Sequence, residues 1–209
     1  MSSRMFDQSR KGARLQTAHG KSGSRRIAVL ATLTALAVGL RGALDLFGEV
    51  TYWNPQTPRD YAAVVLSSIA FLLLGSTLWA IGQDWKGRKT KTGRMARFRR
   101  FSIAVAGIAA VVISVSNFLE DYLLMRWFGA TFVAGSLVLF VALLVATLAR
   151  FAAPPRKETA EAFLLLAITA GVIFSALSPF PAVAALLAAA AYYSFGLRRG
   201  RDQADPAMA

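Results

Sequence analysis

Residues 127–149 read WFGATFVAGSLVLFVALLVATLA, and this stretch decides the class of fold. No charged residue interrupts it. A run of about 20 apolar residues is long enough to cross the ~30 Å hydrocarbon core of a bilayer as a helix. Backbone amides and carbonyls inside lipid must bond to each other, which a helix achieves within one segment. The stretch therefore predicts a transmembrane helix.

Five further segments have the same character, so the sequence predicts an all-α polytopic membrane protein. Hydrophobic residues make up 56% of the chain and charged residues only 17%, fewer than in an ordinary soluble domain. The alternating pattern of a membrane β-barrel is absent. Short connections join the helices into three antiparallel hairpins within a domain of residues 27–197. The predicted helices are 27–48, 61–82, 101–119, 127–149, 160–178 and 180–197.

The basic residues predict the topology. The net charge is +13, yet all but three of the 24 Lys and Arg residues lie in the N-terminal tail 1–26, in the 84–100 and 150–159 loops, or in the C-terminal tail 198–209. These segments alternate with the others, as the positive-inside rule requires for cytoplasmic loops. We therefore predict a multi-pass protein of the cell inner membrane with both termini cytoplasmic, and no nucleic-acid partner. The tail 1–26 is too polar to fold alone and is predicted to be disordered.

Several classes of chemistry are excluded by composition. The chain has no cysteine, and its one histidine, His19, lies in the polar tail. Disulfides, thiolate metal sites and multi-histidine metal sites are therefore ruled out. Phosphate-binding loops, dinucleotide fingerprints and common hydrolase motifs are also missing. We predict no cofactor, no metal site and no identifiable catalytic residue, and the short external loops leave no room for a soluble catalytic domain.

The stretch 41–53, RGALDLFGEVTYW, brings charges to the outer end of the first predicted helix. Arg41, Asp45 and Glu49 are spaced four residues apart, so they share one helical face. Arg41 lies roughly 10 Å inside the outer end at 1.5 Å per residue. An ionisable residue at that depth needs a partner. One interpretation is an internal Arg41–Asp45 ion pair that only anchors the bundle; the other is a polar site between helices.

A second polar set ends the third predicted helix. Asn117, Glu120 and Asp121 lie on one face, at an outer depth similar to that of Asp45. Together such carboxylates could attract cations, bind a hard metal ion through oxygen, shuttle protons or act as acid and base. Taken singly, the simpler interpretation is a solvated acid at a helix end, whereas Asp45 is expected to be buried. That simpler interpretation covers Glu49, Asp60, Glu120 and Asp121.

Other residues are interpreted as membrane anchors or packing positions. Tyr122 and Trp127 belong to the predicted outer aromatic belt. Gly129 and Gly135 should allow close helix contact. The basic loop after the second helix is expected to bind anionic lipid headgroups at the cytoplasmic face. The residues for that contact are Lys86, Arg88, Lys89, Lys91 and Arg94.

Three functions remain open at this stage. The first is transport of a small solute, cation or proton through a polar site between the first and third helices, using Arg41, Asp45, Asn117 and the nearby carboxylates. The second is a non-catalytic accessory or scaffold subunit, bound to another membrane protein or to a second copy of the chain. The third is an intramembrane enzyme acting on a lipid-linked substrate. Transport is favoured because ionisable residues lie at matched depth on two helices that run in the same direction.

Overall fold

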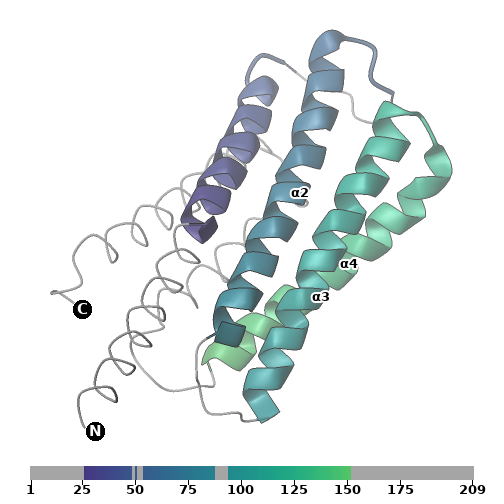
Figure 1. Ribbon diagram of the computed structural model, residues 1–209. Helices are drawn as coiled ribbons and strands as arrows, with labels where there is room; N and C mark the ends of the chain where they lie inside the picture. The colour runs from purple at the N-terminus through teal and green to yellow at the C-terminus, as the bar shows by residue number, and fades with distance from the viewer. Residues whose placement is uncertain (1–25, 49, 51–53, 88–93, 152–209) are drawn as a thin grey trace, which may run out of the picture.

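Four long helices form an antiparallel bundle in the computed structural model (Figure 1). The structure describes residues 26–48, 50, 54–87 and 94–151. A π-helix, Phe118–Tyr122, continues α3, and a 3₁₀ turn, Arg126–Phe128, leads into α4. The long helices are an N-terminal helix, Arg26–Asp45, followed by α2, Pro58–Gly87, α3, Arg94–Asn117, and α4, Gly129–Phe151.

All four helices are long and apolar enough to cross a membrane. They coincide with the first four segments that hydropathy predicts, and they make the chain an all-helical, multi-pass membrane protein. The two remaining predicted helices, 160–178 and 180–197, lie outside the described residues, as do both tails.

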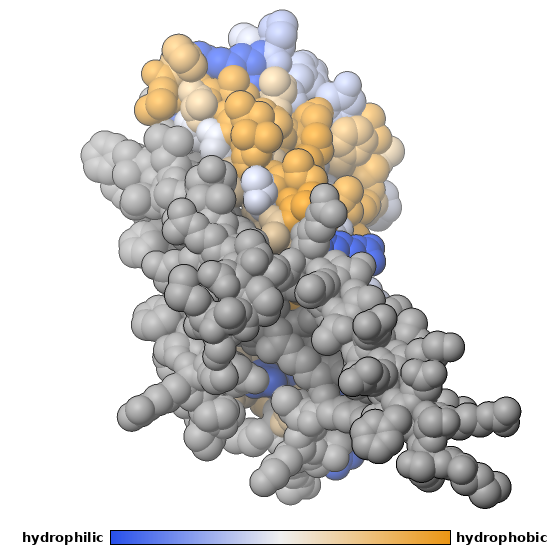
Figure 2. Space-filling model, turned by 60° about the vertical axis from the view of Figure 1, so that its left-hand side comes forward, coloured by the Kyte–Doolittle hydropathy of each residue, from blue (hydrophilic) through white to orange (hydrophobic). Residues whose placement is uncertain are grey.

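The outer surface of the bundle is strongly apolar. Large hydrophobic side chains on every long helix are exposed, among them Leu36, Leu72, Ile108 and Val133. Figure 2 shows such side chains gathered over one flank, with hydrophilic ones near its ends. An apolar surface of this extent is rare on a soluble monomer. In a membrane, the same surface is in contact with lipid tails.

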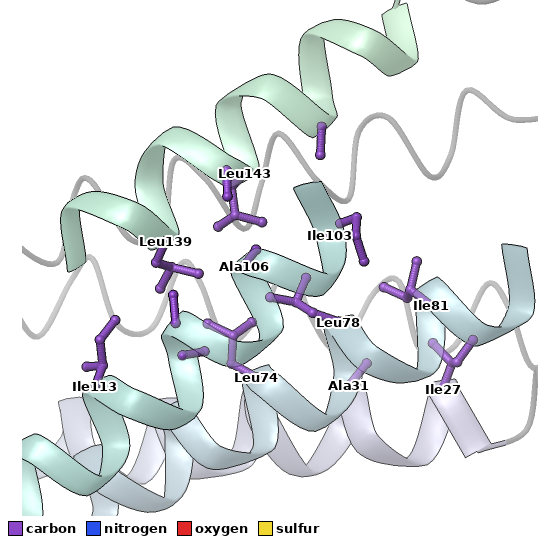
Figure 3. Packing of buried hydrophobic residues seen from close by; sticks show 14 of the residues in the cluster. Ile27, Ala31, Leu74, Leu78, Ile81, Ile103, Ala106, Ile113, Leu139 and Leu143 are labelled. Atoms are coloured by element: carbon purple, nitrogen blue, oxygen red, sulfur yellow. The ribbon is translucent and has the colours of Figure 1, made fainter. Parts of the chain in front are cut away.

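The interior is built from alternating large and small side chains contributed by all four helices. Figure 3 shows the interlocking of this core along the bundle. Small residues on α3 let the larger aliphatic side chains of α2 and α4 approach its axis. The labelled members are Ile27, Ala31, Leu74, Leu78, Ile81, Ile103, Ala106, Ile113, Leu139 and Leu143.

Buried threonines of the N-terminal helix and α2 bond to backbone and to each other. Thr34 of the N-terminal helix and Thr77 of α2 bring their hydroxyl oxygens to 3.3 Å. Each hydroxyl also lies 2.8 Å from the carbonyl oxygen four residues earlier in its own helix. Ser68, Ser76 and Thr77 of α2 each donate to the carbonyl oxygen four residues earlier in the helix.

Helices α2 and α3 touch through two glycines. A Cβ atom on Gly75 would lie 2.9 Å from the carbonyl oxygen of Gly107. A Cβ atom on Gly107 would lie 3.3 Å from the carbonyl oxygen of Gly75. The two backbones are therefore in direct contact, an arrangement that only the smallest residue permits. Sequence reasoning marked small residues on the fourth helix and did not identify this pair.

Changing Gly75 to alanine is therefore expected to destabilise the bundle by about 1–2 kcal/mol, because the new methyl group meets backbone that has no freedom to move. Gly82→Ala is the matched control on the same helix, since its Cβ would lie 3.3 Å from a methyl carbon of Ile103. In detergent, the Gly75→Ala variant should unfold at a lower temperature than the Gly82→Ala variant. Equal unfolding temperatures for the two variants would contradict the glycine contact.

Candidate functional site

Four acidic residues gather at one end of the bundle. The N-terminal helix and α3 run toward this end, and α2 and α4 start from it (Figure 1). We call it the carboxylate end, because it carries Asp45, Asp60, Glu120 and Asp121. Glu49, the fifth acid predicted here, lies outside the described residues.

Arg41 and Asp45 form an ion pair along the N-terminal helix. The Nη1 atom of Arg41 lies 2.7 Å from Oδ2 of Asp45. Only 18% of the arginine side chain and 10% of the aspartate side chain are exposed. The pair therefore combines a short, charge-assisted hydrogen bond with nearly complete burial. Removal of either partner would leave the other charge in a poorly hydrated place.

The end of the N-terminal helix is closed by the start of α2. The helix tightens over its last turn, with the amides of Leu46, Phe47 and Gly48 each donating to the carbonyl three residues earlier. Gly48 then takes φ +127°, which a side chain would strain. The Nη1 atom of Arg59 donates to the carbonyl oxygen of Phe47 at 2.6 Å. A cation is thus placed at the negative end of the helix dipole.

Asp60 caps α2 and is not a solvated loop residue. Only 4% of it is exposed, so the simpler interpretation from sequence is wrong here. Its Oδ2 atom accepts from the amides of Gln56 and Thr57 at 3.2 and 3.0 Å, while its own amide donates to Thr57 Oγ1 at 3.2 Å. This is a reciprocal capping box, with Pro58 as the first helical residue. The spacing of Thr57 and Asp60 already carried that signal.

Asn117 joins α3 to α2 within the apolar interior. Its Nδ2 atom donates to Ser68 Oγ at 2.8 Å and to the carbonyl oxygen of Val64 at 3.3 Å. One turn earlier, Ser114 Oγ donates to the carbonyl oxygen of Ser68 at 2.6 Å. All three side chains of this network are buried. In an apolar medium such bonds fix the register of the two helices.

Glu120 is the buried acid of the π-helix. Only 9% of it is exposed, so the interpretation as a solvated residue is also wrong for this position. Its carboxylate packs against Gly129, the first residue of α4, where a Cβ atom would collide with it. Within the part of the chain that the structure describes, this carboxylate has no hydrogen bond and no ion pair. The positive end of the α4 dipole is the favourable partner that remains.

Asp121 is partly buried beside Glu120 on the same π-helix. Two neighbouring carboxylates repel each other when both are ionised. The π-helix inserts one extra residue per turn, a distortion found often at functional sites. Aromatic contacts hold it in place: the Tyr122 ring lies 5.5 Å from Tyr61 of α2 and 4.7 Å from Phe118, between centroids.

The predicted site residues fall into two groups. Figure 1 places α2 between the N-terminal helix and α3. The Arg41–Asp45 pair therefore lies on one side of α2, and the Asn117, Glu120 and Asp121 group lies on the other. Gly129, against which the Glu120 carboxylate packs, was predicted only as a position of close helix contact. The hydrogen bond of Ser68 with Asn117 depends on how α2 and α3 pack.

No metal centre emerges from the described residues, since they contain no cluster of three or more His, Asp or Glu side chains suited to hold an ion. Of the predicted lipid-headgroup residues, Lys86 lies in the last turn of α2 and Arg94 begins α3. Both belong to the end opposite the carboxylates. Arg88, Lys89 and Lys91 lie outside the described residues.

Comparison of the chain with protein-family models, with curated proteins and with solved structures finds no match.

Proposed function

We propose that this membrane protein binds and moves a small monovalent cation, most simply a proton, through the carboxylate end of the bundle. Six transmembrane helices with both termini in the cytoplasm would direct this end to the outside of the cell. Glu120 and Asp121 are the binding groups in this proposal. Asn117 and its serine partners hold the helix that carries them.

The observation that supports the proposal best is the low exposure of Glu120, 9%, near the end of an apolar span. Charged residues within transmembrane helices commonly mark ion or proton pathways. Three other buried polar side chains in this region have structural partners: Asp60 caps a helix, Asp45 pairs with Arg41, and Asn117 binds Ser68. Among the described residues, the Glu120 carboxylate has no hydrogen bond or ion pair, and it lies against Gly129 at the start of α4. A carboxylate in this position can take up and release a proton without breaking the fold.

The Arg41–Asp45 pair has a different place in this proposal. Because the two opposite charges lie 2.7 Å apart on successive turns of one helix, the pair is suited to stabilise the N-terminal helix. The anchor interpretation of these two residues is therefore preferred over a direct role in transport.

Flux through purified full-length protein in proteoliposomes tests the proposal. An imposed pH gradient, and gradients of Na⁺ and K⁺, should dissipate faster than in protein-free vesicles for at least one ion. Glu120→Gln should lower that rate by about tenfold or more, because the amide cannot exchange a proton at neutral pH. Glu120→Asp should retain part of the rate.

Ser116→Ala is the matched control, since Ser116 is equally buried on α3 and lies one residue before Asn117. It should leave the rate near that of the unmodified chain. Vesicles that hold folded protein and show no flux of any of the three ions would overturn the proposal. Stable co-purification of such inactive protein with a larger membrane complex would favour the accessory-subunit alternative.

A further inference from the structure

The two connections at the carboxylate end expose large apolar side chains. Phe47 is 78% exposed and Trp127 is 76% exposed, the highest values among the large hydrophobic residues of the described chain. They lie just beyond the end of the N-terminal helix and just before α4, where the sequence predicted Phe47 in the last turn of the first helix and Trp127 in the outer aromatic belt. We call the whole set the apolar collar. It consists of Leu46, Phe47, Leu123, Leu124, Met125 and Trp127.

The backbone of the collar bonds to itself. The amides of Leu123 and Met125 donate to the carbonyls of Phe118 and Leu119 at 3.2 and 3.0 Å. The amides of Arg126 and Phe128 donate to the carbonyls of Leu124 and Met125 at 3.1 and 3.0 Å. In the other connection, the last amides of the N-terminal helix donate to the carbonyls three residues earlier. Arg59 donates to the carbonyl oxygen of Phe47. Loops in water do not need such closure, whereas a segment in contact with lipid does.

The collar continues the lipid-facing surface of the helices. Phe118 and Tyr122 on the π-helix and Val133 in the first turns of α4 are also exposed. Its own chemistry adds an exposed arginine, Arg126, beside Trp127. Tryptophan with a flanking basic residue is the combination typical of the membrane–water interface, where the ring meets acyl chains and the cation meets phosphate. A surface that binds a protein partner needs neither continuity with the lipid-facing helices nor a tryptophan beside an arginine.

We propose that the apolar collar is a lipid-binding surface, immersed in the interfacial layer of the bilayer at the carboxylate end. Phe47 and Trp127 enter the boundary between headgroups and acyl chains, and Arg126 contacts lipid phosphate. The Arg41–Asp45 pair and Glu120 then lie deeper than the helix ends alone imply, beneath a layer that excludes bulk water. This inference depends on the exposed side chains of the connections and not on the proposed ion transport.

Depth-dependent fluorescence quenching tests the inference. A chain carrying W53F, W79F and W85F keeps Trp127 as its single tryptophan and is placed in lipid nanodiscs, which leave both faces open to solvent. Lipids brominated near the top of the acyl chain should quench Trp127 roughly twofold, whereas aqueous iodide should quench it little. A chain that keeps only Trp79, which is exposed on α2, is the positive control for contact with lipid. Strong iodide quenching without bromolipid quenching would overturn the proposal in favour of a water-facing loop.

A second measurement uses the absence of cysteine from the chain. Phe47→Cys and Met125→Cys should react slowly with a charged, membrane-impermeant maleimide in nanodiscs. Gln56→Cys is the matched control at the same end, because Gln56 is polar and exposed, and it should react fast. Rapid labelling of all three positions would contradict immersion in lipid. Trp127 protected from both quenchers would instead reveal a protein cover, a second copy or a partner, and would also overturn the proposal.

Discussion

Replacing Arg41 by leucine is expected to destabilise the bundle by roughly 1.5–3 kcal/mol, the range for losing a buried hydrogen bond between charged groups. Asp45 would keep its place, 90% buried beside an aliphatic side chain, and would lose the guanidinium that now lies 2.7 Å away. Unfolding of the purified protein by a denaturing detergent, followed by circular dichroism, measures the loss. The transition should move to a markedly lower detergent fraction.

A double-mutant cycle separates the pair from its surroundings. Asp45→Leu alone removes the carboxylate that lies 2.7 Å from the Arg41 guanidinium and should also be costly. The combined Arg41→Leu and Asp45→Leu variant removes both charges and should recover most of the stability, since a well-packed apolar pair can replace a buried ion pair. Equal destabilisation of the double variant and Arg41→Leu would mean that the arginine acts mainly through other contacts.

The same variants separate the two interpretations of this stretch. If the pair only anchors the N-terminal helix, the stable double variant should transport as well as the unmodified chain. If flux is lost while stability is recovered, the charges themselves take part in function. The stability and flux of one variant thus distinguish an anchor from a binding site.

The helices were predictable because the membrane acts on composition alone. A span of the required length with almost no charge can exist only as a helix in lipid, so the segments 61–82 and 127–149 could be located without tertiary information. Their ends were less predictable. Helix α2 continues to Gly87, past the apolar run, because polar residues at the membrane surface remain good helix formers.

Local side-chain partners were also within reach of the sequence. The Arg41–Asp45 pair follows from a spacing of four on a single helix. The burial of Asp60 follows from the Thr57-Pro58-Arg59-Asp60 pattern, which we interpreted as an ordinary helix end although it carries the spacing of a capping box. Both features depend only on residues within one turn of each other.

The environment of Glu120 depends on packing between helices and could not be read from spacing. Its burial requires the wider turn of the π-helix and the approach of Gly129, nine residues later in the chain. The contact between Asn117 and Ser68 likewise depends on how α2 and α3 meet, which the Gly75–Gly107 contact controls. Hydropathy specifies that helices touch but not which faces meet.

Changing Gly129 to alanine is expected to cost about 1 kcal/mol, because the new Cβ would displace the Glu120 carboxylate, the far end of a flexible side chain, from its present position. The carboxylate would have to leave its place at the start of α4 and lose the favourable dipole there. Thermal unfolding in detergent provides the measurement. Gly135→Ala is the matched control on the same helix, where the added Cβ would lie 3.0 Å from a side-chain carbon of Ile113 that can adjust.

The double variant Gly129→Ala, Glu120→Ala tests whether the contact with Gly129 and the proposed transport both depend on the Glu120 carboxylate. Removing the carboxylate opens space for the new methyl group, so the double variant should be more stable than Gly129→Ala alone. Its flux should stay low, because the proton-binding group is gone. If both stability and flux recover, Glu120 does not bind the transported ion, although its contact with Gly129 is still supported. Unchanged stability in both variants would show that the carboxylate does not rest on Gly129, and the observation that best supports Glu120 as the binding group would be lost.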